Sequence, residues 1–102
     1  MVLSFSPFVF TGFFRVTTYV VYVIWNADHQ RYYIGQTEDL DQRIQQHNDP
    51  NNTLSQFTKR FTGKWKLIYQ ESFTTRKEAL LREKALKSGQ GRQWLKEHVL
   101  PR

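Results

Sequence analysis

The sequence predicts an α+β domain in which helices pack on a small, three-stranded antiparallel β-sheet. The main observation is the order of the expected elements, which runs strand, strand, helix, helix, strand, helix, helix. The length of 102 residues, with 39% hydrophobic and 24% charged residues, is typical of one globular domain. The chain has no cysteine, which excludes disulfides, thiolate metal sites and cysteine nucleophiles.

The beginning of this domain is expected to be a β-hairpin. Residues 19–25 (YVVYVIW) are β-branched or aromatic throughout and predict a strand, and residues 31–35 (RYYIG) predict its partner. Residues 26–29 have the side chains of a turn. A turn over these four residues places Tyr22 directly opposite Tyr33.

The rest of the chain predicts four helices and one strand. The helices are expected to begin at capping side chains and to end at proline or glycine. They span about 39–49 (capped by Asp39 or Thr37, ended by Pro50), 53–61 (capped by Thr53), Thr74 or Thr75 to about Ser88 (ended by Gly89), and 91–98, and the third strand spans 64–71.

The expected domain covers residues 19–98, with a short tail over 99–102. Residues 1–18 are rich in phenylalanine and follow neither helical nor strand periodicity. We expect them to form a disordered extension, with a packed extra strand as the alternative. Arg15 follows the apolar stretch instead of preceding it, which argues against a secretory signal. Because no apolar run reaches the ~20 residues of a membrane-spanning helix, we expect a cytoplasmic protein without membrane contact.

Two phenols are the first candidate functional group. Directly opposed residues of an antiparallel pair point to the same face of a sheet, with Cβ atoms about 4.5–5.5 Å apart. Tyr22 and Tyr33 are therefore expected side by side. Ordinary cross-strand aromatic packing is the simpler explanation of such a pair.

Arg43 and His47 are the second group. They lie four residues apart on a predicted helix, so they share a face, and that face also holds Leu40 and Ile44. A cation on an apolar face needs an anionic partner. Alternatively, Arg43 reaches water from the edge of the face and His47 is a hydrogen-bonded residue near the core.

Glu83 is the third candidate. A helical wheel places it between Ala79 and Leu80 on the expected packing face. A carboxylate in that position needs a cation, a metal ion or several hydrogen-bond donors. A salt bridge with Arg76 or Lys87 is the structural alternative.

Together, these side chains suit the cleavage of a phosphodiester. One carboxylate can hold a hard divalent cation whose shell is completed by water and phosphate oxygens. The planar guanidinium of Arg43 matches a phosphate. A phenol could orient or deprotonate water, although its pKa of ~10 would have to be lowered by a metal, by His47 or by cations. We therefore expect all five side chains on one concave face.

Several short motifs in this order resemble the GIY-YIG nuclease superfamily. They are Val-Val-Tyr (20–22), Tyr-Ile-Gly (33–35), Arg43 with His47, and Glu-Ala-Leu-Leu-Arg-Glu (78–83), and they extend from about Tyr19 to Trp94. The chain is most similar to the small, stand-alone bacterial members and more distantly to the catalytic domain of the excision-repair incision subunit.

The resemblance implies a metal-dependent endonuclease that uses Mg²⁺ or Mn²⁺. By position, Tyr22 matches the tyrosine that activates water, and Tyr33 matches a tyrosine that hydrogen-bonds within the site. Arg43 matches the arginine that contacts the scissile phosphate, His47 matches a histidine or tyrosine position, and Glu83 matches the metal-binding glutamate. DNA is the implied substrate, RNA stays open, and a protein partner could supply specificity.

The basic residues agree with such a substrate. The formal net charge is +6, and twelve of the fifteen Lys and Arg residues follow Asn52, which suggests a polyanionic partner, with a solvated basic surface as an equal alternative from charge alone. The candidates for steering a phosphate backbone are Lys59, Arg60, Lys64, Lys66, Arg76, Lys77 and Arg82.

Two further features remain ambiguous in the sequence. Phe57, Phe61 and Trp65 could stack on bases, but core packing is favoured. Residues 87–92 (KSGQGR) could cradle a phosphate or form a simple turn between helices. The leading hypothesis is a DNA endonuclease. The competing hypotheses are a nucleic-acid-binding module with little or no turnover and a protein–protein adaptor.

Overall fold

The computed structural model describes residues 17–52 and 56–101 and has one three-stranded antiparallel sheet. The strands are β1 (Tyr19–Asn26), β2 (Arg31–Thr37) and β3 (Trp65–Phe73), in the order β2-β1-β3. The helices are α1 (Leu40–Asn48), α2 (Gln56–Lys59), α3 (Arg76–Lys87) and α4 (Gly89–His98). This architecture confirms the predicted α+β class.

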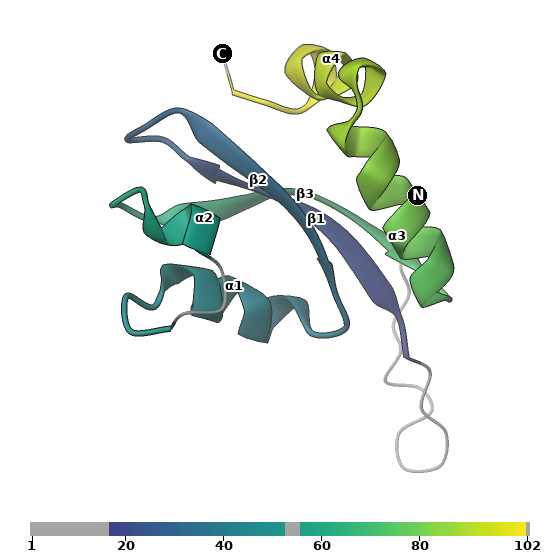
Figure 1. Cartoon of the computed structure of the whole chain (residues 1–102), viewed down its shortest axis with the longest axis horizontal. Coiled ribbons are helices and arrows are strands. Elements are labelled where there is room, and N and C mark those ends of the chain that lie inside the picture. Colours follow the sequence, from purple (N-terminus) through teal and green to yellow (C-terminus); the bar gives the residue numbers. More distant parts are fainter. Residues whose placement is uncertain (1–16, 53–55, 102) are drawn as a thin grey trace.

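The helices cover the two faces of the sheet in pairs (Figure 1). Alternate residues of β1 point to opposite faces, as the pleat requires. Val21 and Val23 pack against Ala79, Leu86 and Leu95 of α3 and α4. On the other face, Val20, Tyr22, Ile24 and Trp65 form a second core, against which Leu40 and Ile44 of α1 pack. The first strand is therefore buried on both sides.

The hairpin register differs from the one expected. The turn covers residues 27–30, Asn26 is paired with Arg31, and Tyr22 faces Gly35 instead of Tyr33. Asn26 supports the turn from the end of the strand, because its Oδ1 accepts a hydrogen bond from the backbone of His29 at 3.1 Å. The predicted turn over 26–29 was wrong, because the observed turn begins and ends one residue later. Because the new pairing moves by two residues, each side chain keeps its face.

Gly35 leaves space for the ring of Tyr22. A Cβ atom built on Gly35 would lie 2.5 Å from the hydroxyl oxygen of Tyr22 and 2.7 Å from its Cζ. The phenol therefore lies across β1 and β2 directly over the glycine. Tyr22 is completely buried, so its ring has little freedom to move aside.

Local side-chain signals account for the helix ends. Asp39 caps α1 by accepting from the backbone of Gln42, and Thr75 caps α3 in the same way through Glu78. Gly89 was expected to end α3, but Ser88 caps both helices and Gly89 already begins α4. Ser88 alone thus joins the two helices, and residues 89–92 form the first turn of α4.

The remaining differences are small. The expected helix over 53–61 is present as α2, and residues 53–55 lie outside the described part of the chain. Leu80, expected on the packing face of α3, is 46% exposed. Of the expected N-terminal extension, residues 1–16 also lie outside the described part. Val99 and Leu100, expected in a tail, pack against the core. In the described segments, no helix is long and apolar enough to cross a membrane.

We expect Gly35→Ala to destabilise the fold by about 1–3 kcal/mol, the usual cost of overpacking, because the new methyl group collides with the ring of Tyr22. Urea unfolding of the variant and the wild type measures the difference. Gly89→Ala is the matched control, since a Cβ there meets no atom within 4 Å. Equal destabilisation of the two variants would contradict the close approach of Tyr22 to Gly35.

Candidate active site

Three aromatic side chains from three elements meet on the face of the sheet that α1 covers. They are Tyr22 of β1, Tyr33 of β2 and His47 of α1. The ring centroid of His47 lies 4.9 Å from that of Tyr33 and 5.8 Å from that of Tyr22, and the two phenol rings are 6.3 Å apart. Tyr22 and His47 are buried, whereas Tyr33 is half-buried and accessible.

His47 has a hydrogen-bond partner at each ring nitrogen. Its Nε2 lies 2.8 Å from the hydroxyl of Tyr22, and its Nδ1 lies 3.0 Å from Oγ1 of Thr58 in α2. A neutral imidazole donates from one nitrogen and accepts at the other. If Nδ1 donates to Thr58, Nε2 accepts the proton of Tyr22. Sequence reasoning missed Thr58, because nothing in the sequence distinguishes it from the other threonines.

Burial keeps both Tyr22 and His47 uncharged at neutral pH. Desolvation, together with the positive charges of Arg43 and Lys59, lowers the pKa of His47 to about 4. Desolvation raises the pKa of Tyr22, and the neighbouring phenol of Tyr33 acts in the same direction. The proton of Tyr22 is therefore firmly bound at neutral pH.

Arg43 lies beside the hydroxyl of Tyr22. Its charge and its N–H groups both oppose the increase in the pKa of Tyr22. Arg43 is half-buried, and within residues 17–52 and 56–101 it has no ion pair with a carboxylate. The described part of the protein therefore does not contain the anionic partner that we expected for Arg43. The guanidinium is available to bind an anionic ligand.

Glu83 belongs to a helix, α3, that packs on the face of the sheet that holds Val21 and Val23. The convergence of all five side chains on one concave face stays a prediction. The carboxylate nevertheless lies close enough to Tyr22 for its charge to raise the pKa of that phenol. Of the two ion pairs considered for Glu83, the one with Lys87 is present, with Nζ and Oε2 2.7 Å apart.

The Glu83 carboxylate is a suitable protein ligand for one divalent cation that would bind together with the substrate. The described residues contain no group of three or more His, Asp and Glu side chains that could hold a metal alone. Mg²⁺ does not need such a group, because it is often held by one or two carboxylates, water and substrate phosphates. The Lys87 side chain is 49% exposed and that of Glu83 is 18% exposed, so the ammonium reaches the carboxylate from the solvent side. A divalent cation at Glu83 would have to displace Lys87.

Three of the seven basic candidates are engaged within the protein. Lys59 donates to the backbone oxygens of Gln46 and His47, which end α1. Arg76 pairs with Glu38, and Arg82 pairs with Glu71.

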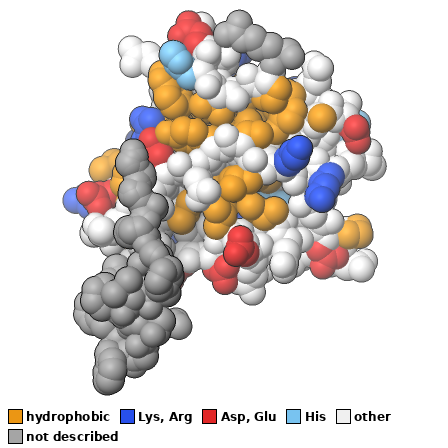
Figure 2. Space-filling view, turned by 180° about the vertical axis from the view of Figure 1, so that it is seen from behind, with side chains coloured by type: hydrophobic (Ala, Val, Ile, Leu, Met, Phe, Trp, Pro, Cys, Tyr) orange, Lys and Arg blue, Asp and Glu red, His pale blue; other side chains and the backbone are white. Residues whose placement is uncertain are grey.

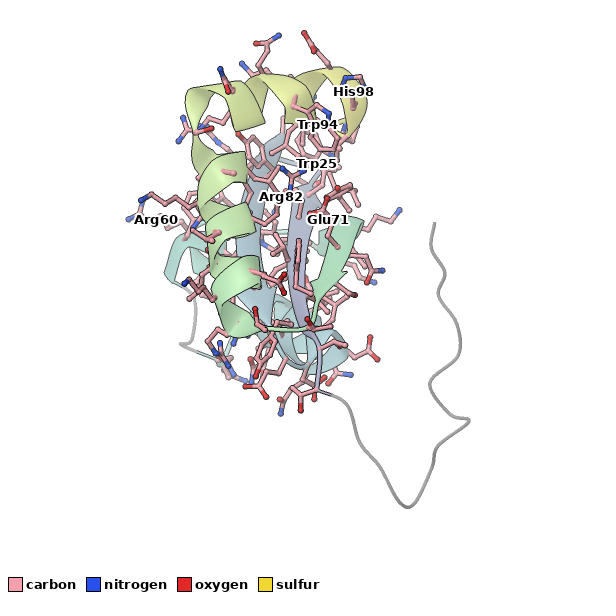
Figure 3. The ribbon with its side chains drawn as sticks, turned by 90° about the vertical axis from the view of Figure 1, so that its right-hand side faces the viewer. Trp25, Arg60, Glu71, Arg82, Trp94 and His98 are labelled. Atoms are coloured by element: carbon pink, nitrogen blue, oxygen red, sulfur yellow. The ribbon has the colours of Figure 1, made fainter. Side chains whose placement is uncertain are left out.

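The seven candidates do not form one surface. Figure 3 shows that Arg82 points from α3 toward Glu71, whereas Arg60 stands at the opposite edge of the molecule. Seen from behind, the Lys and Arg side chains are scattered around hydrophobic ones (Figure 2). The contact of Arg60, Lys64, Lys66 and Lys77 with a phosphate backbone stays a prediction.

The low pKa of His47 makes stability depend on pH. The unfolded chain takes up this proton near pH 6.5 and the folded chain only near pH 4, so the free energy of unfolding falls as the pH decreases through that interval. We expect the titration of His47 to lower the free energy of unfolding by up to about 3 kcal/mol over this interval. Urea unfolding across this range should show that His47→Gln removes the dependence, whereas His98→Gln retains it. An unchanged pH dependence in His47→Gln would rule out the buried, neutral state.

A comparison with protein families adds to this geometry. The GIY-YIG catalytic domain matches residues 18–96, which include β1, both tyrosines, α1 and α3. No curated protein and no solved structure is detectably similar to the chain. Nucleases of this family act on nucleic acid and generally use divalent metal ions. Because the match covers most of the chain and includes Tyr22, Tyr33, Arg43, His47 and Glu83, the protein belongs to the GIY-YIG nuclease superfamily.

Proposed function

We propose that the protein is a divalent-metal-dependent endonuclease that hydrolyses phosphodiester bonds of DNA. The observation that carries this proposal is the hydrogen bond between the Tyr22 hydroxyl and Nε2 of a neutral His47, beside a guanidinium with no carboxylate partner in the described chain. Tyr22 and His47 can transfer a proton in this arrangement, and the guanidinium beside them can bind a phosphate.

Tyr22 and His47 act together on the attacking water. As the water attacks phosphorus, its proton passes to the Tyr22 oxygen while the phenolic proton passes to Nε2 of His47. Tyr22 thus never has to exist as a free phenolate, which its raised pKa disfavours. The negative charge of the phosphate raises the pKa of His47 and so helps it to accept this proton.

Arg43 and Glu83 hold the reacting phosphate. The Arg43 guanidinium, which lies next to Tyr22, binds the phosphate oxygens and keeps the phosphorus near the water. Glu83 would hold Mg²⁺ or Mn²⁺ after release from Lys87. When bound, such an ion stabilises negative charge on the phosphate and on the leaving oxygen.

A nucleic-acid-binding module without turnover is the second candidate. The observation that favours it is the ion pair that already occupies Glu83. The two functions differ in outcome when the protein meets plasmid and branched DNA with Mg²⁺ or Mn²⁺. Nicking that requires the metal supports the enzyme, whereas gel retardation without cleavage on every substrate supports the module.

Glu83→Gln should lower metal-dependent nicking by about 100-fold or more, because the amide is a poor ligand for a hard cation. The rate is measured with supercoiled plasmid, with EDTA as the metal-free blank. Glu97→Gln, an exposed carboxylate on α4, is the matched control and should keep the wild-type rate. Full activity of Glu83→Gln would rule out the proposed metal ligand.

Tyr22→Phe should reduce cleavage by about 10²–10⁴-fold, the usual contribution of general acid–base catalysis, while the ring still packs over Gly35. Tyr19→Phe removes a half-buried hydroxyl elsewhere on β1 and should cleave normally. The same plasmid assay measures both variants. If Tyr22→Phe were folded and equally active, the proton path through Tyr22 would have to be abandoned.

A further inference from the structure

A cavity of about 440 Å³ opens at the free edge of β2, next to the candidate active site. Its walls come from β2, from α2 and from the junction of α3 and α4. Such a volume lies within the about 300–1,000 Å³ of typical ligand sites. The lining contains three aromatic and three cationic side chains but no acidic one: Tyr32, Tyr33, Phe57, Arg31, Lys87 and Arg92.

Two residues join this cavity to the candidate active site. Tyr33 lines the cavity, and its ring lies 4.9 Å from His47 and 5.8 Å from Phe57. Lys87 also lines the cavity, and its ammonium pairs with Glu83. A strand whose phosphate sits at Arg43 and Glu83 therefore has its neighbouring nucleotide within reach of the cavity.

Phe57 has the environment of a stacking platform. Of the three aromatic residues considered for base stacking, Trp65 is in the core, whereas Phe57 is 38% exposed. The ring of Phe57 is supported by Phe61 at 5.4 Å and by Trp65 at 6.3 Å. Supported by these rings and partly open to solvent, it can offer a fixed aromatic surface to a ligand.

The cations of the cavity are suited to a phosphate backbone. Among the residues with described positions, the exposed Arg92 side chain has no hydrogen-bond or ion-pair partner. Lys87 is 49% exposed and pairs with Glu83, one helical turn before it. Aromatic rings beside cationic side chains are the usual arrangement for single-stranded nucleic acid, in which the bases stack on the rings and the phosphates contact the charges.

We propose that this cavity binds an unpaired nucleotide next to the scissile phosphate, with its base stacked on Phe57 and its backbone at Lys87 and Arg92. This proposal rests on the proposed function and names its substrate class. A base inside an intact duplex has both faces covered by its neighbours, so it cannot lie on Phe57 without leaving the stack. The preferred DNA is therefore single-stranded, frayed or branched at the cleavage site.

Binding without cleavage tests this subsite. Fluorescence anisotropy in EDTA compares three labelled DNAs: a short single strand, the abasic backbone of the same length with the same phosphates, and the corresponding duplex. We expect the wild-type protein to bind the single strand about tenfold more tightly than the abasic backbone, in line with the stacking of one base. The duplex should bind about as weakly as the abasic strand.

Two variants separate the base contact from the phosphate contact. Phe57→Leu keeps an apolar side chain. In this variant, the ratio of the affinities for the base-bearing and the abasic strand should fall close to one. Arg92→Ala should weaken both strands alike, by several-fold, and keep the preference. Leu81→Ala, which changes an exposed apolar residue on α3, is the control and should bind as the wild type does.

The results also separate this proposal from the proposed function. Equal binding of the base-bearing and abasic strands by the wild type overturns the proposed subsite. This result is expected if the cavity binds any polyanion or an acidic peptide. An unchanged preference in Phe57→Leu overturns it as well, even if the protein cleaves DNA. A preference that Phe57→Leu abolishes supports the subsite, even if no metal ever produces cleavage.

Discussion

The close contact between Tyr22 and Gly35 determines the rest of the site. A side chain on Gly35 would occupy the space that the phenol uses, so the glycine allows Tyr22 to lie flat across two strands. In that position its hydroxyl meets Nε2 of His47, which α1 presents from above the same face. The bond between His47 and Thr58 then fixes the ring from the other side. A tightly packed β-hairpin thus sets the direction of the proposed proton transfer.

Charged groups from helices on both faces of the sheet act on the hydroxyl of Tyr22. Tyr33 and Glu83 raise the pKa of Tyr22, and Arg43 lowers it. A phosphate would add further negative charge, so it requires cations that this site only partly supplies. The Lys87 ammonium near Glu83 neutralises one carboxylate in the free protein. A divalent ion in its place would leave an excess of positive charge for the phosphate, which is the electrostatic reason to expect a metal here.

Local signals in the sequence predicted much of the fold, and tertiary contacts caused the errors. The strands, the caps at Asp39 and Thr75 and the order of elements depend on neighbouring residues. The hairpin register depends on Asn26, whose side chain also donates to the backbone of Thr62, thirty-six residues later. Glu83 could be recognised as a carboxylate that needs a cation, but a helical wheel does not show on which face of the sheet its helix packs.

The basic residues show why net charge is a poor guide to a binding surface. Arg82 and Arg76 neutralise acidic residues, and Lys59 closes the end of α1 with two backbone oxygens. These contacts stabilise the fold, and the charge of Lys59 also lowers the pKa of His47. No ion pair in the described chain involves the remaining candidate cations, Arg60, Lys64, Lys66 and Lys77. Phosphate contacts carry no sequence information. In the proposed nuclease, discrimination between substrates would therefore come from the shape and aromatic lining next to the site, where Phe57 and Tyr33 lie.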